Sequence, residues 1–507
     1  MEIINLPQPE SHPAQVSDVE KCIGDSKEKF NLILSEIING GNCEAHKAES
    51  MIFKWLLELG LILLKLFFAN YNQGDFGHTI ETAQVSAARG RTGSRKYFSI
   101  FGKVTVSRYL YHTEKETFAP LDILLNLPER CYSYFLSEMI NLLNIKGAYS
   151  EGIGFVKRFF GLQISVSASE TISGESSSCC ETYYESRDIS EDSAESDDKK
   201  DYTAVSFDGK GIPMIKKEAV KITGRQGKGQ KRQKKKESLV GVKYEIDANI
   251  RSADEVAKNL VYPEKKEENQ DNKKDIKAQN IRYIASIAKP KKDVMKEIYE
   301  EVKNKDFSST PLLCLMDGSP YLWDYLKTVF TEITNKICIL DIIHVLEYIW
   351  IIAHIMYKEG SDNAKKYVFE KLKLISEGNI ASYIMELQTE MQSGRWKKKS
   401  HQEKFEKVIT YFKNHSQYMK YDEYLLKGYP IGTGVIESAC GHLVKDRMEL
   451  SGARWGIDGA ESVLRLRSVV KSGDWDEYWN FFTDQAGKNP FFPDEYNQFY
   501  LQEKKYA

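Results

Sequence analysis

Two aspartates stand where their side chains could act together, although they are far apart along the chain. Asp208 closes the apolar run DYTAVSFDG (201–209), and Asp317 closes the run PLLCLMDG (311–318). Both runs have the composition of buried strands. The glycine after each aspartate lets the backbone turn without burying the carboxylate. In α/β sheets the carboxyl ends of such strands border the crevice where ligands bind.

A third acidic residue, Glu437, lies in the stretch YPIGTGVIESACGHLVKDRMELSGARW (429–455). A glycine-rich turn precedes it and predicts the start of a helix. At 100° per residue the apolar side chains of this helix form one stripe, with Glu437 at its edge. Gly441, one turn further on, leaves room beside the carboxylate. The stripe consists of Val435, Ile436, Ala439, Cys440, Leu443 and Val444.

Carboxylates that converge from three segments repel one another unless a cation lies between them. Oxygen ligands with open positions suit Mg²⁺ or Mn²⁺, and a pair of such ions about 4 Å apart can stabilise the attacking and leaving oxygens of phosphoryl transfer. The ordinary alternative is that Asp-Gly is a common turn dipeptide, because a single aspartate at a strand end is more often a turn former than a ligand. The residues alone leave both interpretations open.

The elements around the two aspartates predict an α/β domain. Strands are expected at 201–209, 238–250, 280–288, 311–318 and 336–341, with helices at 291–304, 321–334 and 342–357. This order indicates a mixed sheet with helices on both faces. Residues 360–428 are rich in lysine and poor in strand patterns, which is typical of a helical insertion.

The N-terminal part of the chain is mainly helical in its pattern. Residues 16–70 have helical periodicity, and residues 95–111 alternate around Phe101-Gly102 as a β-hairpin does. Helices predicted at 133–147, 150–161 and within 163–184 have the order of a helix-turn-helix. Three short helices form an ordinary bundle just as often. We therefore divide the chain into 1–90, a DNA-binding region 91–180, an acidic linker 181–201, a core 202–358 and 430–475, the insertion 359–429, and a tail 476–507.

The bulk composition excludes several classes of protein. The net charge of −2 over 507 residues rules out a uniformly basic nucleic-acid coat. Eight scattered cysteines without a CxxC pair indicate neither a zinc module nor a disulfide framework, and fit a reducing cytoplasm. No signal peptide is recognised at the start. The apolar run 51–68 contains Lys54, Glu58 and Lys65 on one side, so we expect a buried amphipathic helix and not a membrane span.

Four blocks of this sequence resemble the DDE transposases of bacterial insertion sequences, specifically the ISKra-type family. They are SFDGKGIPM (206–214), LMDGSPYLW (315–323), DIIHVLEYIW (341–350) and PIGTGVIESACGHLVKDRMELSGARW (430–455). The resemblance covers residues 95 to 470 and implies an RNase H-like catalytic core with a helical insertion before the final glutamate. It also implies that Asp208, Asp317 and Glu437 are the catalytic, metal-binding triad, holding two Mg²⁺ ions (or Mn²⁺).

Two further residues match an Asp-x-x-His motif that related transposases carry. Asp341 and His344 share a helix face at this spacing. Their role could be to support the site near the scissile phosphate. Alternatively, Asp341 is simply a helix N-cap and His344 a buried, hydrogen-bonded histidine. Family members carry a cysteine pair where this chain has Tyr111 and His112, so we expect no zinc.

Basic residues suggest where DNA would be contacted. Arginine suits phosphate, and an exposed tryptophan can stack on an unpaired base. Against this, the basic loop 225–236 could be a solvated surface segment, and Trp455 a core residue. The candidate contacts are Arg225, Lys228, Lys231, Arg232, Lys234, Lys235, Lys445, Arg447, Arg454 and Trp455.

The expected function is therefore transposition. The protein would bind the terminal inverted repeats of its element, cut double-stranded DNA with metal ions and join the freed 3′ ends to target DNA, as a cytoplasmic, nucleoid-associated dimer or larger assembly. Two alternatives remain at this stage. One is a structure-selective or repair nuclease with an RNase H-like fold, and the other is a non-catalytic DNA-binding regulator derived from a transposase.

Overall fold

The computed structural model of the chain describes residues 13–39, 43–81, 86–114, 116–187, 200–221, 234–263, 276–450 and 452–487. The internal contacts divide these residues into two compact units, which we describe separately. The first unit comprises residues up to 185 together with those from 476 onward, and the second unit comprises residues 186–475. Much of the acidic linker and part of the basic loop lie outside the described residues.

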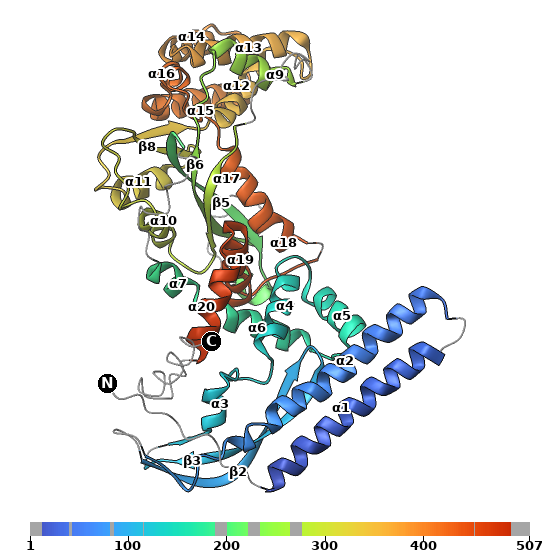
Figure 1. The fold of residues 1–507 in the computed structure, drawn as a ribbon. Coiled ribbons are helices and arrows are strands. Elements are labelled where there is room, and N and C mark those ends of the chain that lie inside the picture. Colours follow the sequence, from blue (N-terminus) through green and yellow to red (C-terminus); the bar gives the residue numbers. More distant parts are fainter. Residues whose placement is uncertain are drawn as a thin grey trace. The chain divides into compact units, whose positions relative to one another are not determined.

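The first unit begins with a long helical hairpin and an antiparallel sheet of order β1-β2-β3-β4 (Figure 1). Strands β2 and β3 pair around a turn at residues 100–101, which confirms the predicted β-hairpin. The strands are β1 (Thr79–Glu81), β2 (Ser86–Ser99), β3 (Gly102–His112) and β4 (Thr117–Phe118). The helices are α1 (Pro13–Asn39), α2 (Ala45–Ala69), α3 (Pro120–Leu124), α4 (Tyr134–Asn144), α5 (Tyr149–Phe160), α6 (Val166–Ser176), α7 (Cys180–Ser186) and α20 (Trp475–Gly487).

Helices α4, α5 and α6 confirm the three predicted helices of the 133–184 region. Buried polar side chains join α4 to α6: Asn144 Nδ2 donates to Ser173 Oγ over 2.9 Å, and Ser169 Oγ donates to Asn144 Oδ1 over 3.1 Å. The outward side of α6 carries Glu170 and Glu175 and no lysine or arginine. This charge does not suit a helix lying in a DNA groove, and DNA contact by this region stays a prediction.

The C-terminal end of the described chain is a helix and belongs to the first unit. In α20 the hydroxyl of Tyr478 donates to the carbonyl of Ser176, and Tyr183 donates to Glu477 Oε2 over 3.0 Å. Residues 476–507 were predicted to be a tail, but the described part of this stretch forms most of α20, because its aromatic residues share one apolar helix face.

The second unit is built on a five-stranded mixed sheet of order β7-β6-β5-β8-β9. Strands β7, β6 and β5 pair antiparallel, whereas β5, β8 and β9 pair parallel. All five predicted strands are confirmed, and the mixed α/β class with them. Their bounds are β5 (Tyr202–Pro213), β6 (Lys235–Ile246), β7 (Gln279–Ser286), β8 (Leu312–Met316) and β9 (Lys336–Leu340).

Helices cover both faces of this sheet, as the element order predicted (Figure 1). Successive residues of a strand point to opposite faces. Phe207 packs against Phe330 at the end of α11, on the side of α10, whereas Asp208 points toward the α17 side, where it meets Cys440. The helices are α8 (Lys216–Ala219), α9 (Ala253–Val261), α10 (Lys291–Glu300), α11 (Pro320–Val329), α12 (Ile342–Met356), α17 (Gly434–Ala439), α18 (Asp446–Met448) and α19 (Ile457–Ser472).

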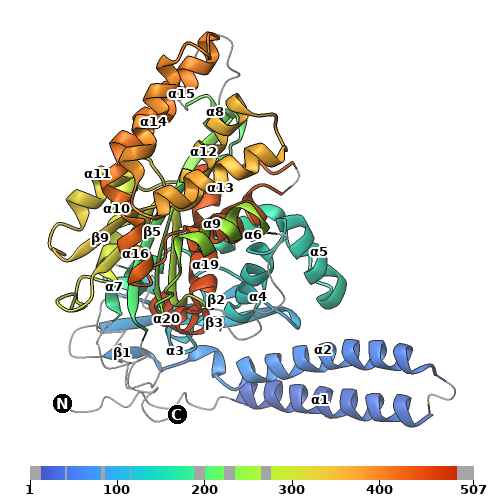
Figure 2. The same cartoon turned by 90° about the horizontal axis from the view of Figure 1, so that it is seen from above.

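Between α12 and α17 the chain forms the predicted helical insertion, visible in orange in Figure 2. Helix α13 packs against both α12 and α9, and α15 packs against α12. Helix α9, between β6 and β7, was not predicted. The insertion contains α13 (Asp362–Ser376), α14 (Ile380–Gln392), α15 (Lys399–His415), a 3₁₀ turn (Ser416–Tyr418) and α16 (Tyr421–Leu426).

Helix α2 departs from the expected burial. It does contain the apolar run 51–68, but Phe68 is the only residue of this fully described helix that is almost completely buried. The apolar side chains lie all round the helix, and one face of them remains exposed. Among the described residues, no helix is long and apolar enough to cross a membrane.

Candidate active site

The register of the parallel strands brings three aspartates to the same edge of the sheet. The last pairs are Phe207 with Met316 between β5 and β8, and Met316 with Leu340 between β8 and β9. The next residue on each strand path is Asp208, Asp317 and Asp341. Neighbouring strands are about 4.8 Å apart. The three carboxylates therefore start from adjacent backbone positions, although Asp208 lies within β5 and not at its end.

The side chain of Asp341 has a structural role. Its side chain is buried and caps α12 by accepting from the backbone N–H of Ile343 over 3.1 Å. It also accepts from Thr433 twice, from the backbone N–H over 3.1 Å and from the hydroxyl over 2.7 Å. Thr433 immediately precedes α17, the helix that carries Glu437. Asp341 is thus the predicted N-cap, and it also fixes the start of the glutamate helix.

The glutamate helix lies against β5 and β6. The thiol of Cys440, one turn after Glu437, donates to Asp208 Oδ2 over 3.2 Å. Residues Cys440–Lys445 form a wider π-helical turn, and such turns are frequent at functional sites. The predicted stripe is buried except for Val435, which is half-buried, and a side chain at Gly441 would meet open space within 4 Å. The sequence therefore predicted this local arrangement well, apart from the π turn.

The pKa values of two acidic residues of the site, Asp317 and Glu437, are raised. Burial is the main cause that raises the pKa of Asp317, and the negative charge of Asp208 adds to it, against the hydrogen bond that Asp317 accepts from the backbone N–H of Ser319. Burial also raises the pKa of Glu437, followed by the charges of Asp341 and Asp208. Asp317 and Glu437 are therefore short of compensating positive charge.

His344 is the one basic side chain whose charge would lower the pKa of both Asp317 and Glu437 in the described part of the site. Burial acts to lower the pKa of His344, but its hydrogen bond to Glu347 and the charges of Asp341 and Asp317 outweigh burial and raise it. The ring nitrogen Nδ1 lies 3.2 Å from Glu347 Oε2. The imidazole is half-exposed and not buried, so His344 differs from the buried histidine that was weighed as the alternative for this position.

The helical insertion contributes Tyr411 to the site, a side chain that no sequence pattern indicated. Tyr411 of α15 stacks on Tyr348 with ring centroids 3.7 Å apart. Its ring also covers Gly318, where an added Cβ would lie 2.3 Å from Cε2 of Tyr411. Within the described residues its hydroxyl is buried and has no hydrogen-bond partner. Burial raises the pKa of Tyr411, and the charges of Tyr348, Asp317 and Asp341 add to this.

The donor chemistry of Asp208, Asp317 and Glu437 fits a hard divalent cation, because all three offer carboxylate oxygens and repel one another. However, among the described residues no three His, Cys, Asp or Glu side chains are grouped closely enough to hold a metal ion. Without a cation the three negative charges oppose a closer approach of the carboxylates, and the thiol of Cys440 donates to one oxygen of Asp208. A cation that bound this oxygen of Asp208 would displace the thiol contact.

The predicted DNA contacts fall into three groups. Arg225, Lys228, Lys231 and Arg232 lie outside the described residues. Lys234, Lys445 and Arg454 are exposed, whereas Lys235 Nζ is 2.5 Å from Glu449 Oε1.

Arg447 and Trp455 differ from the expectation because both are buried. The guanidinium of Arg447 lies over the Trp455 ring, 4.7 Å from its centroid, and the indole donates to the carbonyl of Met448 over 3.0 Å. The backbone of Trp455 also bonds Pro213 and Ile215 at the end of β5. These two side chains are not available to DNA in this arrangement, so we leave them out of the DNA-binding surface.

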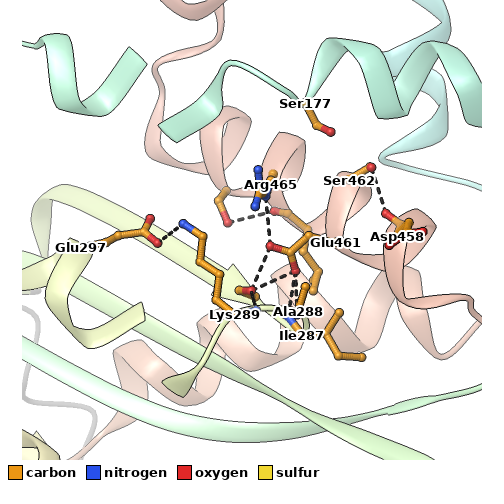
Figure 3. A network of polar contacts seen from close by, with 12 residues as sticks. Ser177, Ile287, Ala288, Lys289, Glu297, Asp458, Glu461, Ser462 and Arg465 are labelled. Carbon is orange, nitrogen blue, oxygen red and sulfur yellow. Dashed lines mark hydrogen bonds and ion pairs between the residues drawn. The ribbon is translucent and has the colours of Figure 1, made fainter. Parts of the chain in front are cut away.

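A second buried carboxylate in this unit has a complete set of partners. Glu461 of α19 accepts from the hydroxyl of Ser286, from the backbone N–H groups of Ile287 and Ala288, and from Arg465, over 2.9 to 3.1 Å (Figure 3). It thereby satisfies backbone donors just beyond the end of β7 and anchors α19 to that strand. The sequence analysis did not select Glu461, because a glutamate in a helical pattern gives no signal of its distant partners.

Comparison with known proteins adds no assignment, since no protein-family model and no curated protein matches this chain.

Proposed function

We propose that this protein is a DDE-type transposase with an RNase H-like catalytic core. The observation that carries the proposal is the shared register of β5, β8 and β9, which sets Asp208 and Asp317 on adjacent strands. The contact of the Glu437 helix with Asp208 through Cys440 supports it. So does the helical insertion that precedes the glutamate, an arrangement that the sequence resemblance implies.

In this proposal Asp208, Asp317 and Glu437 would hold two Mg²⁺ ions. Bound there, the ions would activate the attacking oxygen and stabilise the leaving oxygen of the scissile phosphodiester. The chain's own task is positioning. Asp341 holds the start of α17 through Thr433, and Tyr411 closes the site above Gly318. Lys234, Lys445 and Arg454 are free to contact phosphates.

Purified protein, incubated with a DNA fragment that carries the flanking inverted repeats, tests the proposal. We expect cleavage that requires Mg²⁺ or Mn²⁺, followed by joining of the 3′ ends to target DNA. Asp208→Asn, Asp317→Asn and Glu437→Gln should each lower cleavage by about a thousandfold or more while end binding persists. Asp324→Asn, at an exposed position of α11, is the matched control and should cut normally.

The products discriminate the alternatives. Ends without joined products would identify a nuclease of the same fold, and binding without divalent-dependent cleavage would identify a regulator. Near-normal cleavage by any one of the three carboxylate variants would sink the active-site assignment.

A further inference from the structure

The hairpin of α1 and α2 exposes an apolar face that nothing within the described chain covers. Its side chains are large and between 38% and 78% exposed. They come from both helices, which lie side by side and antiparallel (Figures 1 and 2). We call this set the hairpin face: Ile23, Phe30, Leu34, Ile37 and Ile38 of α1, and Leu56, Leu63 and Phe67 of α2.

The residues of the hairpin face point to one side of the hairpin. At 100° per residue the five α1 positions fall within about 100°, and the three α2 positions within about 40°. The less exposed positions indicate the sides on which the helices meet: Cys22, Ser26, Lys29 and Ile33 on α1, and Ile52, Trp55, Ile62 and Leu66 on α2. Because antiparallel helices turn in opposite senses, both sets then lie on the same side.

Another side of α2, about 110° round the helix from its hairpin-face residues, is already occupied. Leu61, Leu64 and Phe68 pack in one cluster with Val104 and Val106 of β3. The hairpin face is therefore turned away from the sheet of its own unit.

The spacing of the exposed residues is that of a helix–helix seam. Positions 23, 30, 34 and 37 are separated by seven, four and three residues, and positions 56, 63 and 67 by seven and four. Steps of three and four are the a/d spacing at which apolar residues interlock between helices. The helices contain 27 and 25 residues, long enough to form a bundle along their length.

The area of the hairpin face is large enough for a stable dimer. At roughly 200 Å² for each large side chain when fully exposed, the eight residues present about 800 Å² of apolar surface, the amount that each partner contributes to a standard interface. It exceeds the largest apolar patch of most monomers.

The charges of the hairpin exclude other occupants. Helices α1 and α2 together carry six lysines against seven acidic residues. A DNA partner or an anionic membrane surface requires a basic excess, which is lacking here. Exposed charges of both signs lie within or beside the hairpin face, with Glu20 and Lys27 on α1 and Glu49 on α2. A surface with both signs can complement itself across a two-fold axis.

We propose that a second copy of this chain docks on the hairpin face, so that two hairpins form an antiparallel four-helix bundle. The hydrophobic effect drives this association, because each copy covers the apolar side chains of the other. The inference does not depend on the proposed function, since a nuclease or a regulator with this hairpin would dimerise in the same way.

The full-length protein in reducing buffer, studied by light scattering after size exclusion, tests this. We expect the mass of a dimer at micromolar concentration. The double variant Leu34→Glu, Leu63→Glu should raise the dissociation constant by about a hundredfold or more, because charges would replace apolar contacts in both copies. Leu32→Glu is the matched control: Leu32 is 48% exposed but lies on the opposite side of α1, so this variant should stay dimeric.

A monomeric wild-type protein would overturn the proposal, and so would a double variant that dimerises as tightly as the wild type. Circular dichroism checks that the hairpin remains helical. If the glutamates unfold it, the double variant Leu34→Gln, Leu63→Gln keeps good helix formers and should still weaken the dimer. Unchanged dimerisation in that variant would equally refute the inference.

Discussion

Two groups of carboxylates in the second unit differ in how their oxygens are satisfied. Glu461 and Asp341 accept hydrogen bonds from backbone N–H groups and hydroxyls, and each joins two elements that are distant in sequence. Asp317 and Glu437 have raised pKa values, to which the neighbouring acidic charges contribute. A satisfied buried carboxylate stabilises the fold, whereas an under-compensated one indicates a partner that binds from outside.

The strongest test of this difference is cation binding. Mn²⁺ or Mg²⁺ should raise the melting temperature of the wild-type protein, with about 2.7 kcal/mol of stabilisation when the free ion reaches a hundred times its dissociation constant. Asp317→Asn should lose most of that gain. Differential scanning fluorimetry with and without EDTA measures it, with Ca²⁺-free buffers throughout. If Asp317→Asn gained as much stability from the cation as the wild type does, the cation would bind elsewhere.

Replacement of Glu461 should lower the thermal stability of the protein, because this carboxylate stabilises the fold. The Glu461 carboxylate accepts hydrogen bonds from four donors. In Glu461→Gln an NH₂ group, which donates, replaces one of its oxygens and leaves buried donors unpaired, at a cost of about 2–3 kcal/mol. The transition of the second unit should fall by roughly 5 °C. Glu300→Gln, which breaks only a surface pair with Lys303, should change little. If Glu461→Gln melted like wild type, its hydrogen bonds would not anchor α19.

The substitution Tyr411→Phe distinguishes a packing role of Tyr411 from a chemical role in the candidate active site. Phenylalanine keeps the stack on Tyr348 but removes a buried hydroxyl that has no partner among the described residues. Stability should therefore stay constant or rise. We expect the DNA cleavage rate to fall about tenfold, equivalent to about 1.4 kcal/mol, because a donor close to Asp317 is lost. Full activity in this variant would restrict Tyr411 to a packing role.

The smallest expected effect is a pH dependence of stability. Because the pKa values of Asp317 and Glu437 are raised in the folded state, the folded protein binds their protons more readily than the unfolded chain does. Stability without metal should therefore decrease as pH rises from about 4 to 7. In Asp317→Asn this decrease should be shallower. Melting curves in EDTA across this range measure it, and an identical slope in both proteins would contradict the assignment.

The core of the site could be predicted because its signals are local. Strand patterns ending in Asp-Gly, the glycine-rich turn before Glu437 and the apolar stripe behind it are all visible in short windows of sequence. The structure has strands in the same places and pairs them so that Asp208 and Asp317 are adjacent, although β5 continues beyond Asp208 to Pro213. The assignment of these residues to catalysis remains a prediction.

The contacts that sequence reasoning missed all depend on distant partners. Tyr411 reaches Gly318 across about ninety positions of the chain, and Glu461 meets the end of β7 from α19. Arg447 and Trp455 were candidates for DNA contact, with a core position for Trp455 as the alternative, because an aromatic residue beside arginines has the same composition at a DNA surface as in a core. Solvent exposure decides between these, and it depends on tertiary packing.

The path of α20 has a consequence for biosynthesis. Tyr478 and Glu477 complete the packing of the first unit against Ser176 and Tyr183, almost three hundred residues earlier. A chain emerging from the ribosome therefore finishes its second unit before the first can close.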